Sequence, residues 1–195
     1  MTRIGVILGS TRPGRRGESV ARWVMDGAGR RSDAEFELVD LADYPLPHLD
    51  EPLPPSMGQY QNAHTQVWAA TIGRFDGFVF VTPEYNHSTS GVLKNAIDFL
   101  YAEWNNKAMG VVSYGVVGGA RAAEHLRLIA GELQMATSGP TSLSRCSPIL
   151  KTSPNSDPPR IRPRCSTRFL ARSWPGARCW HHCGTSLKPP SRLAA

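Results

Sequence analysis

Three polar, glycine-rich stretches hold the residues whose types could bind a charged ligand. The first, residues 9–19, reads GSTRPGRRGES and combines three glycines with three arginines and several hydroxyl groups. Glycine lets the backbone approach a ligand closely, and hydroxyl and guanidinium groups donate hydrogen bonds to anions. Neither a Walker pattern nor GxGxxG is present. The stretch predicts an anion site suited to a phosphate, and a solubilising turn with scattered arginines is the alternative.

The second and third stretches offer groups that could surround a flat ring. Residues 82–91 read TPEYNHSTSG, and residues 113–121 read SYGVVGGAR. In the second, Pro83 fixes a turn, and backbone N–H groups beyond it could address the edge of a heterocycle. In the third, glycines around a tyrosine indicate close backbone approach to something flat. A capped loop leading into a helix and a glycine-permitted turn are the respective alternatives. We name no general base, because a single loop histidine such as His87 is more often simply solvated.

The elements that must position these stretches alternate in type. Apolar runs near residues 4–8, 36–41, 78–81 and 108–112 predict strands, and helical spacing of apolar residues predicts helices near 20–28, 59–75, 92–100 and 122–133. Five prolines between residues 42 and 58 predict a long loop without regular structure. This order favours an α/β fold with a parallel sheet and helices on both faces. Ligands of such sheets bind beyond the carboxyl ends of the strands, where all three stretches lie.

The three stretches together resemble the NADPH-dependent FMN reductase family. GSTRPGRRG, TPEYNHSTSGVLKNAIDFL and SYGVVGGARAAEHLR occur in the family's order, and the resemblance covers residues 2 to about 137. It implies a flavodoxin-like, three-layer α/β/α sandwich with a sheet of order 2-1-3-4-5. It also implies noncovalent FMN, NADPH or NADH as co-substrate, and a homodimer or homotetramer.

The resemblance also implies which residues bind the cofactor. The FMN phosphate would be held by Ser10, Arg12, Arg15, Arg16, Gly17 and Ser19. The ribityl chain and ring would be lined by Pro83, Glu84, Tyr85 and Asn86. The pyrimidine side would be bordered by Ser113, Tyr114, Gly115 and Gly118. No catalytic side chain and no metal is expected, because the flavin itself carries the chemistry.

The implied activity is hydride transfer from NADPH to bound FMN and onward reduction of a small molecule. Free flavin, a quinone, an azo compound or chromate are the candidate acceptors. The alternative function is an FMN-binding electron carrier of the flavodoxin type, without nicotinamide turnover. Reduction of the bound flavin by NADPH distinguishes the enzyme from the carrier.

The composition changes sharply after Thr137. Residues 1–137 contain 12 basic and 15 acidic residues, whereas residues 138–195 contain 10 basic residues and one acidic residue. The later segment also holds nine of the 16 prolines and all four cysteines. We therefore predict a flavodoxin-like domain over 1–137 and a basic, Pro/Ser/Arg-rich, disordered tail over 138–195. The sheet would then lack the fifth strand that the family has, leaving the order 2-1-3-4.

A shift of reading frame near Thr137 explains the tail better than a function does. If codons permitted for residues 138–151 are read one frame over, they can encode a strand-like segment. Codons permitted for residues 165–189 can likewise encode an amphipathic helix, and the family has both elements. A zinc site at Cys179, His181, His182 and Cys183 lacks properly spaced ligand pairs. A nucleic-acid-binding arm suits the charge, but few aromatic residues accompany it. We expect neither nucleic acid nor a membrane as partner, and, without an apparent leader, a cytoplasmic protein.

Overall fold

The computed structural model describes residues 1–137, and the predictions made for the tail lie outside this range. The strands are β1 (Thr2–Leu8), β2 (Ala34–Asp40), β3 (Gly77–Pro83), β4 (Ala108–Tyr114) and β5 (Ala136–Thr137). The helices are α1 (Gly17–Ala28), α2 (Ala63–Gly73), α3 (Gly91–Asp98) and α4 (Ala120–Glu132). Each predicted strand and helix within the domain is confirmed. The proline-rich loop contains two short 3₁₀ turns, Leu41–Asp43 and Pro55–Met57, so the prediction of no regular structure there is wrong in that detail.

The five strands form one parallel sheet of order β2-β1-β3-β4-β5. The predicted order of the first four strands is confirmed, but the predicted loss of the fifth is wrong. Ala136 and Thr137 pair with Ala108 and Met109 at the start of β4. The strand could not be recognised in the sequence, because two residues are too few to show a periodic spacing of apolar side chains.

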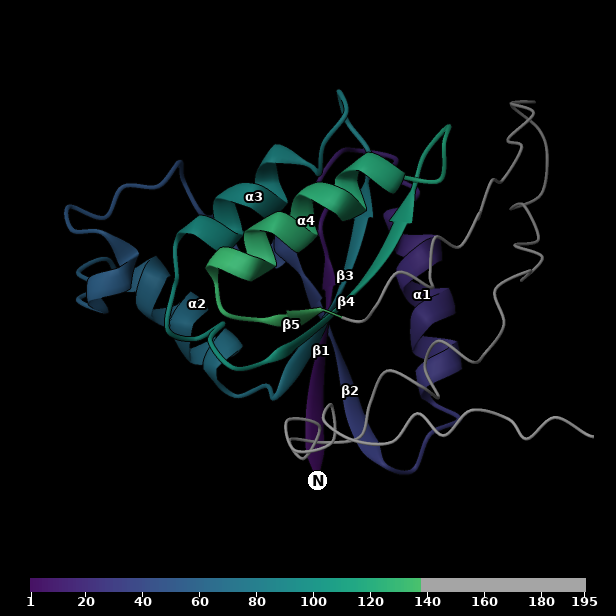
Figure 1. Ribbon diagram of the computed structural model, residues 1–195, viewed down its shortest axis with the longest axis horizontal. Helices are drawn as coiled ribbons and strands as arrows, with labels where there is room; N and C mark the ends of the chain where they lie inside the picture. Colours follow the sequence, from purple (N-terminus) through teal and green to yellow (C-terminus); the bar gives the residue numbers. More distant parts are fainter. Residues whose placement is uncertain (138–195) are drawn as a thin grey trace, which may run out of the picture.

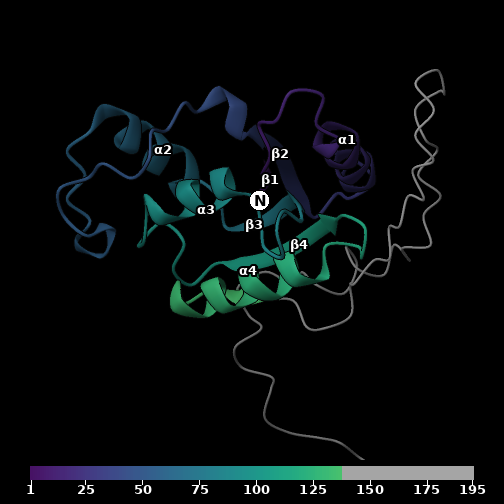
Figure 2. The same cartoon turned by 90° about the horizontal axis from the view of Figure 1, so that it is seen from above.

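Helices cover the two faces of the sheet unequally (Figure 1). Among the described residues, α2, α3 and α4 lie on one face and α1 lies alone on the other, as the view from above also shows (Figure 2). The larger core joins Trp68, Phe78, Phe80 and Trp104, all 0–1% exposed, and the smaller core packs α1 against β1 and β3. The three layers are those of the flavodoxin-like fold that the resemblance implied.

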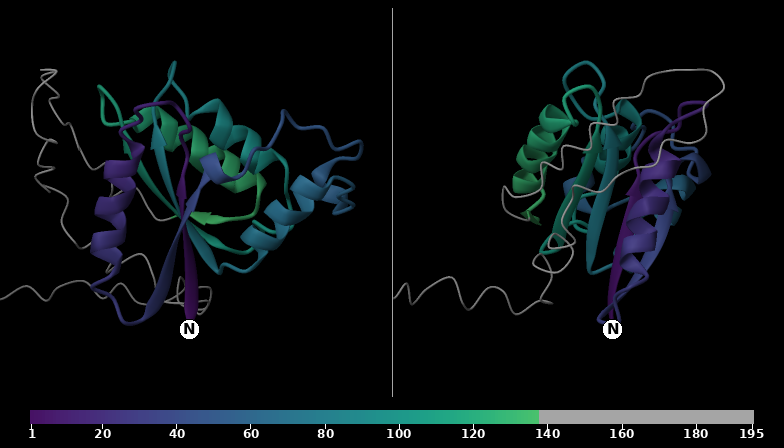
Figure 3. Two further views of the ribbon diagram at one scale, coloured as in Figure 1. Left: turned by 180° about the vertical axis from the view of Figure 1, so that it is seen from behind. Right: turned by 90° about the vertical axis from the view of Figure 1, so that its right-hand side faces the viewer.

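The strand register brings the carboxyl ends of the strands to one edge. Leu8 pairs with Asp40 and with Val81, and Pro83 pairs with Tyr114. The loops that follow β1, β3 and β4 therefore leave from one edge, at the end of the molecule opposite the chain's amino terminus (Figures 1 and 3). This edge is the candidate site.

Candidate functional site

The loop after β1 is shaped by a Pro-Gly turn. Gly14 has a φ of +65°, and the Arg15 N–H donates to the Arg12 carbonyl at 3.0 Å. Proline followed by a residue with positive φ is the pattern of a type II turn, and at such a φ glycine carries no steric cost. The turn leaves Arg12 exposed at the rim of the sheet edge.

Arg15 braces this loop from within. Its guanidinium donates to both carboxylate oxygens of Asp40, at 2.8 and 2.5 Å, and to the Ser10 carbonyl at 2.5 Å. Its Nε also donates to Glu18 at 3.0 Å. The hydrogen bond to Asp40 is the main cause that raises the pKa of Arg15, against the opposing effect of burial. Arg15 thus fixes the loop, and its predicted contact with phosphate stays a prediction.

Sequence reasoning missed Asp40, although its position gave a usable signal. Asp40 ends β2, the strand beside β1, and therefore reaches the same edge as the loop after β1. A carboxylate at the end of a predicted neighbouring strand is a natural partner for one of three clustered arginines.

The beginning of α1 supplies backbone donors, and no capping side chain takes them within residues 1–137. The residue before the helix, Arg16, makes no side-chain capping bond, whereas Ser90 accepts the Leu93 N–H at the start of α3. The first N–H groups of a helix lack partners inside it and carry the positive end of its dipole. Buried Ser10 and exposed Arg12 lie in the loop that leads into this helix end, and Gly17 and Ser19 lie in its first turn. These residues fit a phosphate.

The loop after β3 contains a strained turn. Asn86 and His87 have φ values of 47° and 74°, and Tyr85 and Ser88 exchange backbone hydrogen bonds of 2.9 and 3.0 Å. Two consecutive positive φ values within such a pair describe a type I′ turn, which glycine normally favours. Side chains held in this conformation often mark a functional site.

Glu84 clamps this loop to the start of α4. Its carboxylate, 8% exposed, accepts the Arg121 N–H at 3.1 Å and the Arg121 Nη1 at 2.8 Å. Its own N–H donates to the Tyr114 carbonyl at 3.0 Å. The Glu84 side chain and N–H are therefore already used, and only its backbone carbonyl remains for the predicted contact with the ribityl chain or ring.

A histidine that was not among the predicted site residues supports the strained turn. His125, on α4, has its Nδ1 2.9 Å from the Ser88 hydroxyl, and its ring centroid lies 6.0 Å from that of His87. His125 lies four residues after Arg121 on the same helix, so its contact lies one turn beyond the Glu84–Arg121 ion pair. Helix α4 thus holds the turn at two points.

Ser90 ties the first loop to the second. Its hydroxyl donates to the Gly9 carbonyl, and the Gly9 N–H donates to the Val81 carbonyl at 2.8 Å. A Cβ on Gly9 would lie 2.8 Å from Leu93 Cδ2, so this close approach requires glycine. Ser90 also caps α3, since its hydroxyl accepts the Leu93 N–H.

The loop after β4 curls back onto its own strand. The Ser113 hydroxyl donates to the Gly118 carbonyl at 3.0 Å, and Gly118 and Gly119 have φ values of 77° and 75°. Val116, at the tip, is 99% exposed. Tyr114 points to the α1 face of the sheet, where it joins the smaller core. The edge therefore assembles all three predicted stretches.

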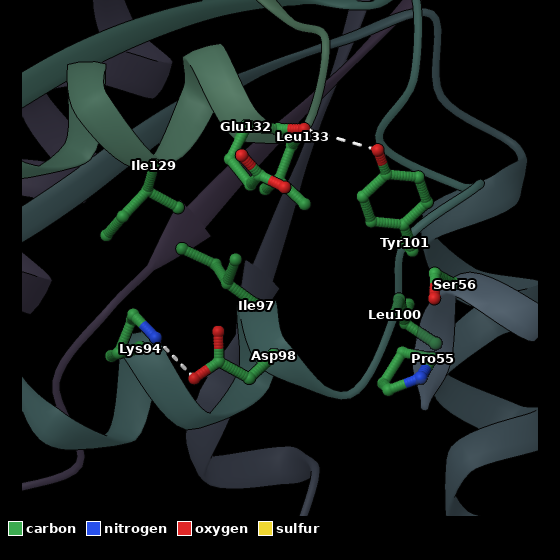
Figure 4. A pocket seen from close by; sticks show the side chains of 10 residues that line it. All are labelled: Pro55, Ser56, Lys94, Ile97, Asp98, Leu100, Tyr101, Ile129, Glu132 and Leu133. Carbon is green, nitrogen blue, oxygen red and sulfur yellow. Dashed lines mark hydrogen bonds and ion pairs between the residues drawn. The ribbon is translucent and has the colours of Figure 1, made fainter. Parts of the chain in front are cut away.

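A cavity within residues 1–137 lies away from this edge. A pocket of about 340 Å³ opens between α3, α4 and the turn at Pro55, with Ile97, Leu100 and Ile129 among its apolar walls (Figure 4). Tyr101 and the Lys94–Asp98 ion pair stand at its margin. None of the predicted cofactor residues lines it, so it is separate from the candidate site.

Neither a metal-binding cluster nor a membrane-spanning helix occurs within residues 1–137. No group of three or more His, Cys, Asp or Glu side chains is arranged to hold a metal ion. None of the helices in this range has the length and apolar character needed to span a bilayer.

Comparison with known proteins finds a family model and relatives that match this chain. Residues 2–146 match the family model described as NADPH-dependent FMN reductase. An NAD(P)H-dependent FMN reductase of Schizosaccharomyces pombe is 46% identical over 135 residues, covering 68% of each chain. A quinone reductase of Escherichia coli is 36% identical over 133 residues, covering 65% of this chain and 68% of the relative. The matched part thus spans about two thirds of these relatives.

A solved structure shows the same fold. The flavoenzyme NAD(P)H:(acceptor) oxidoreductase FerB of Paracoccus denitrificans superposes with a TM-score of 0.59. The two sequences are 24% identical, and the match covers 72% of this chain and 77% of the other. This similarity supports the flavodoxin-like fold.

Proposed function

The chain belongs to the NADPH-dependent FMN reductase family, and on that premise we propose that it binds FMN at the β1, β3 and β4 loops and reduces a small-molecule acceptor with NAD(P)H. The observation that carries the proposal is the uncapped amino terminus of α1 beside Ser10 and Arg12. Backbone N–H groups at a helix start, a hydroxyl and a guanidinium are the donors that a phosphate dianion requires.

The chain's own residues position the cofactor rather than react with it. When bound, FMN supplies the exchange of hydride and electrons between NAD(P)H and the acceptor. Arg15 and Asp40 fix the conformation of the loop after β1, because their ion pair joins this loop to the end of β2. Glu84 and His125 hold the strained turn at Asn86 and His87, where backbone groups would address the ring. None of these roles moves a proton, so we assign no acid or base.

A quinone is the acceptor class we favour. The relatives include a quinone reductase of Escherichia coli and a 2-hydroxy-1,4-benzoquinone reductase of a Burkholderia species. Exposed Tyr85 and Val116 lie on the two loops that would flank the ring, and they offer apolar surface to a flat acceptor. The exposed turn at Asn86 and His87 leaves that edge open to solvent.

An anaerobic titration tests the proposed function. The protein reconstituted with FMN should lose its yellow colour when NADPH is added, and a benzoquinone should restore it. Flavin that stays yellow with both NADPH and NADH would indicate an electron carrier instead. A protein that takes up no FMN would refute the assignment of the site.

A further inference from the structure

The Tyr114 hydroxyl lies far from the end of the site to which sequence reasoning assigned this residue. The resemblance placed Tyr114 on the pyrimidine side, beyond β4. In the structure, a Cβ added to Gly17 would lie 2.9 Å from the Tyr114 hydroxyl oxygen. Gly17 is the first residue of α1, so the tyrosine extends from the end of β4 to the helix that follows β1. Its hydroxyl therefore lies at the proposed phosphate end.

The same hydroxyl is surrounded by the other residues of that end. Burial raises the pKa of Tyr114 to about 12, and the neighbouring Tyr85 adds to the increase. The charges of Arg12 and Arg15 oppose the increase, so both guanidinium groups lie near the phenol. The Ser10 hydroxyl lies 3.5 Å from the hydroxyl of Tyr85, the same tyrosine that neighbours Tyr114. The tyrosine hydroxyl is thus neutral at physiological pH and keeps a proton to donate.

A neutral donor suits this location. Four of the five N–H donors of Arg15 are already committed to Asp40, Glu18 and the Ser10 carbonyl, so this side chain has little left to offer a ligand. The amide groups at the start of α1 and exposed Arg12 remain, and the Tyr114 hydroxyl adds a donor on the inner, half-buried side. Hydrogen bonds to ionised acceptors are stronger than those between neutral groups.

We propose that the Tyr114 hydroxyl donates a hydrogen bond to the phosphate of bound FMN and thereby makes the site select phosphorylated flavin over riboflavin. The proposal rests on the proposed function, since it names the role of one more residue in that site. It rests independently on the contact with Gly17, which no family resemblance supplied. It also replaces the expected pyrimidine contact of this side chain.

The test compares two flavins that differ only in the phosphate. Apo wild type and Tyr114→Phe are titrated with FMN and with riboflavin, and binding is followed by quenching of flavin fluorescence. FMN affinity of the variant should fall about tenfold to a hundredfold, the usual loss for one hydrogen bond to a charged group. Riboflavin affinity should not change, because riboflavin carries no phosphate.

A matched control removes another tyrosine hydroxyl far from the site. Tyr101 donates to the Glu132 carbonyl at 3.3 Å beside the pocket of Figure 4, so Tyr101→Phe should leave both affinities unchanged. The ³¹P resonance of bound FMN should shift in Tyr114→Phe and not in Tyr101→Phe. Thermal unfolding of each apo variant verifies that it is folded.

The possible outcomes are distinct. Equal losses of FMN and riboflavin affinity in Tyr114→Phe would overturn the proposal, because the residue would then act through the ring or the fold. Unchanged FMN affinity would overturn it as well. A wild type that binds neither flavin would refute the proposed function instead, which separates the two failures.

Discussion

Replacing Gly119 with alanine should damage both the fold and the candidate site. Gly119 precedes α4 with a φ of +75°, a conformation in which a side chain is strained. A Cβ there would lie 2.5 Å from the Ser113 Cβ and 2.7 Å from the Tyr114 nitrogen. Both contacts involve the end of β4, which cannot rotate away as a flexible side chain would. The loop that curls back onto β4 must therefore move.

The expected cost follows from two separate effects. The left-handed conformation costs an alanine about 1–2 kcal/mol. Overpacking against fixed neighbours adds roughly 1–3 kcal/mol. The free energy of unfolding should therefore fall by about 2–5 kcal/mol, which lowers the midpoint of thermal unfolding by roughly 5–15 °C.

Gly131→Ala is the matched control, at the opposite end of α4. A Cβ on Gly131 would meet nothing within 4 Å, and the residue lies inside the helix. Alanine should stabilise this position by up to about 1 kcal/mol, because it loses less chain entropy on folding than glycine does.

Thermal unfolding of the apo proteins and titration with FMN measure the two consequences. Gly119→Ala should melt well below wild type and bind FMN more weakly, and Gly131→Ala should melt at or above wild type with unchanged affinity. If the two variants melted together, the described packing of the β4 loop would be wrong.

Three other predictions concern the Arg15–Asp40 ion pair, the Tyr114 hydroxyl and the reading frame of the gene. Asp40→Asn should lower the free energy of unfolding by about 1–2 kcal/mol because Arg15 loses a charged partner. Asp33→Asn, which removes the exposed partner of Arg31, should have no measurable effect in the same urea titration. Because folding raises the pKa of Tyr114 from 10.0 to about 12, its contribution to stability is complete below pH 10 and is lost as the pH rises through 12. Urea unfolding from pH 9 to 12 should show a smaller decline for Tyr114→Phe than for wild type, and equal declines would contradict this reasoning. The gene sequence beyond codon 137, read one frame over, should encode a strand-like segment followed by an amphipathic helix, and stop codons or the absence of both segments in that frame would disprove the frameshift.

The architecture could be predicted well because the spacing of apolar residues and the positions of glycines determine helices, strands and turns locally. The run ending at Leu8 and the clearer run ending at Pro83 each lead into a polar loop, and parallel strands must bring such loops to one edge. Positions of the loops could therefore be inferred without knowledge of any side-chain contact. The family match agrees with that inference.

Individual roles within the site were less predictable because partners distant in sequence compete for the same charge. Three arginines in one loop appeared equivalent, yet Arg15 is taken by Asp40, 25 residues away. Glu84 appeared to be a ligand contact, yet Arg121 holds it, 37 residues away. The family resemblance places Tyr114 beside the pyrimidine ring, and the approach of its hydroxyl to Gly17 depends on a χ angle that no sequence pattern encodes.

The central place of β3 has a consequence for how the domain opens. β3 is paired with β1 on one side and with β4 on the other, and four of its residues are fully or almost fully buried. Local opening begins where backbone bonds and packing are sparse. Among the described strands, β3 should therefore be the last to exchange its amide hydrogens for deuterium.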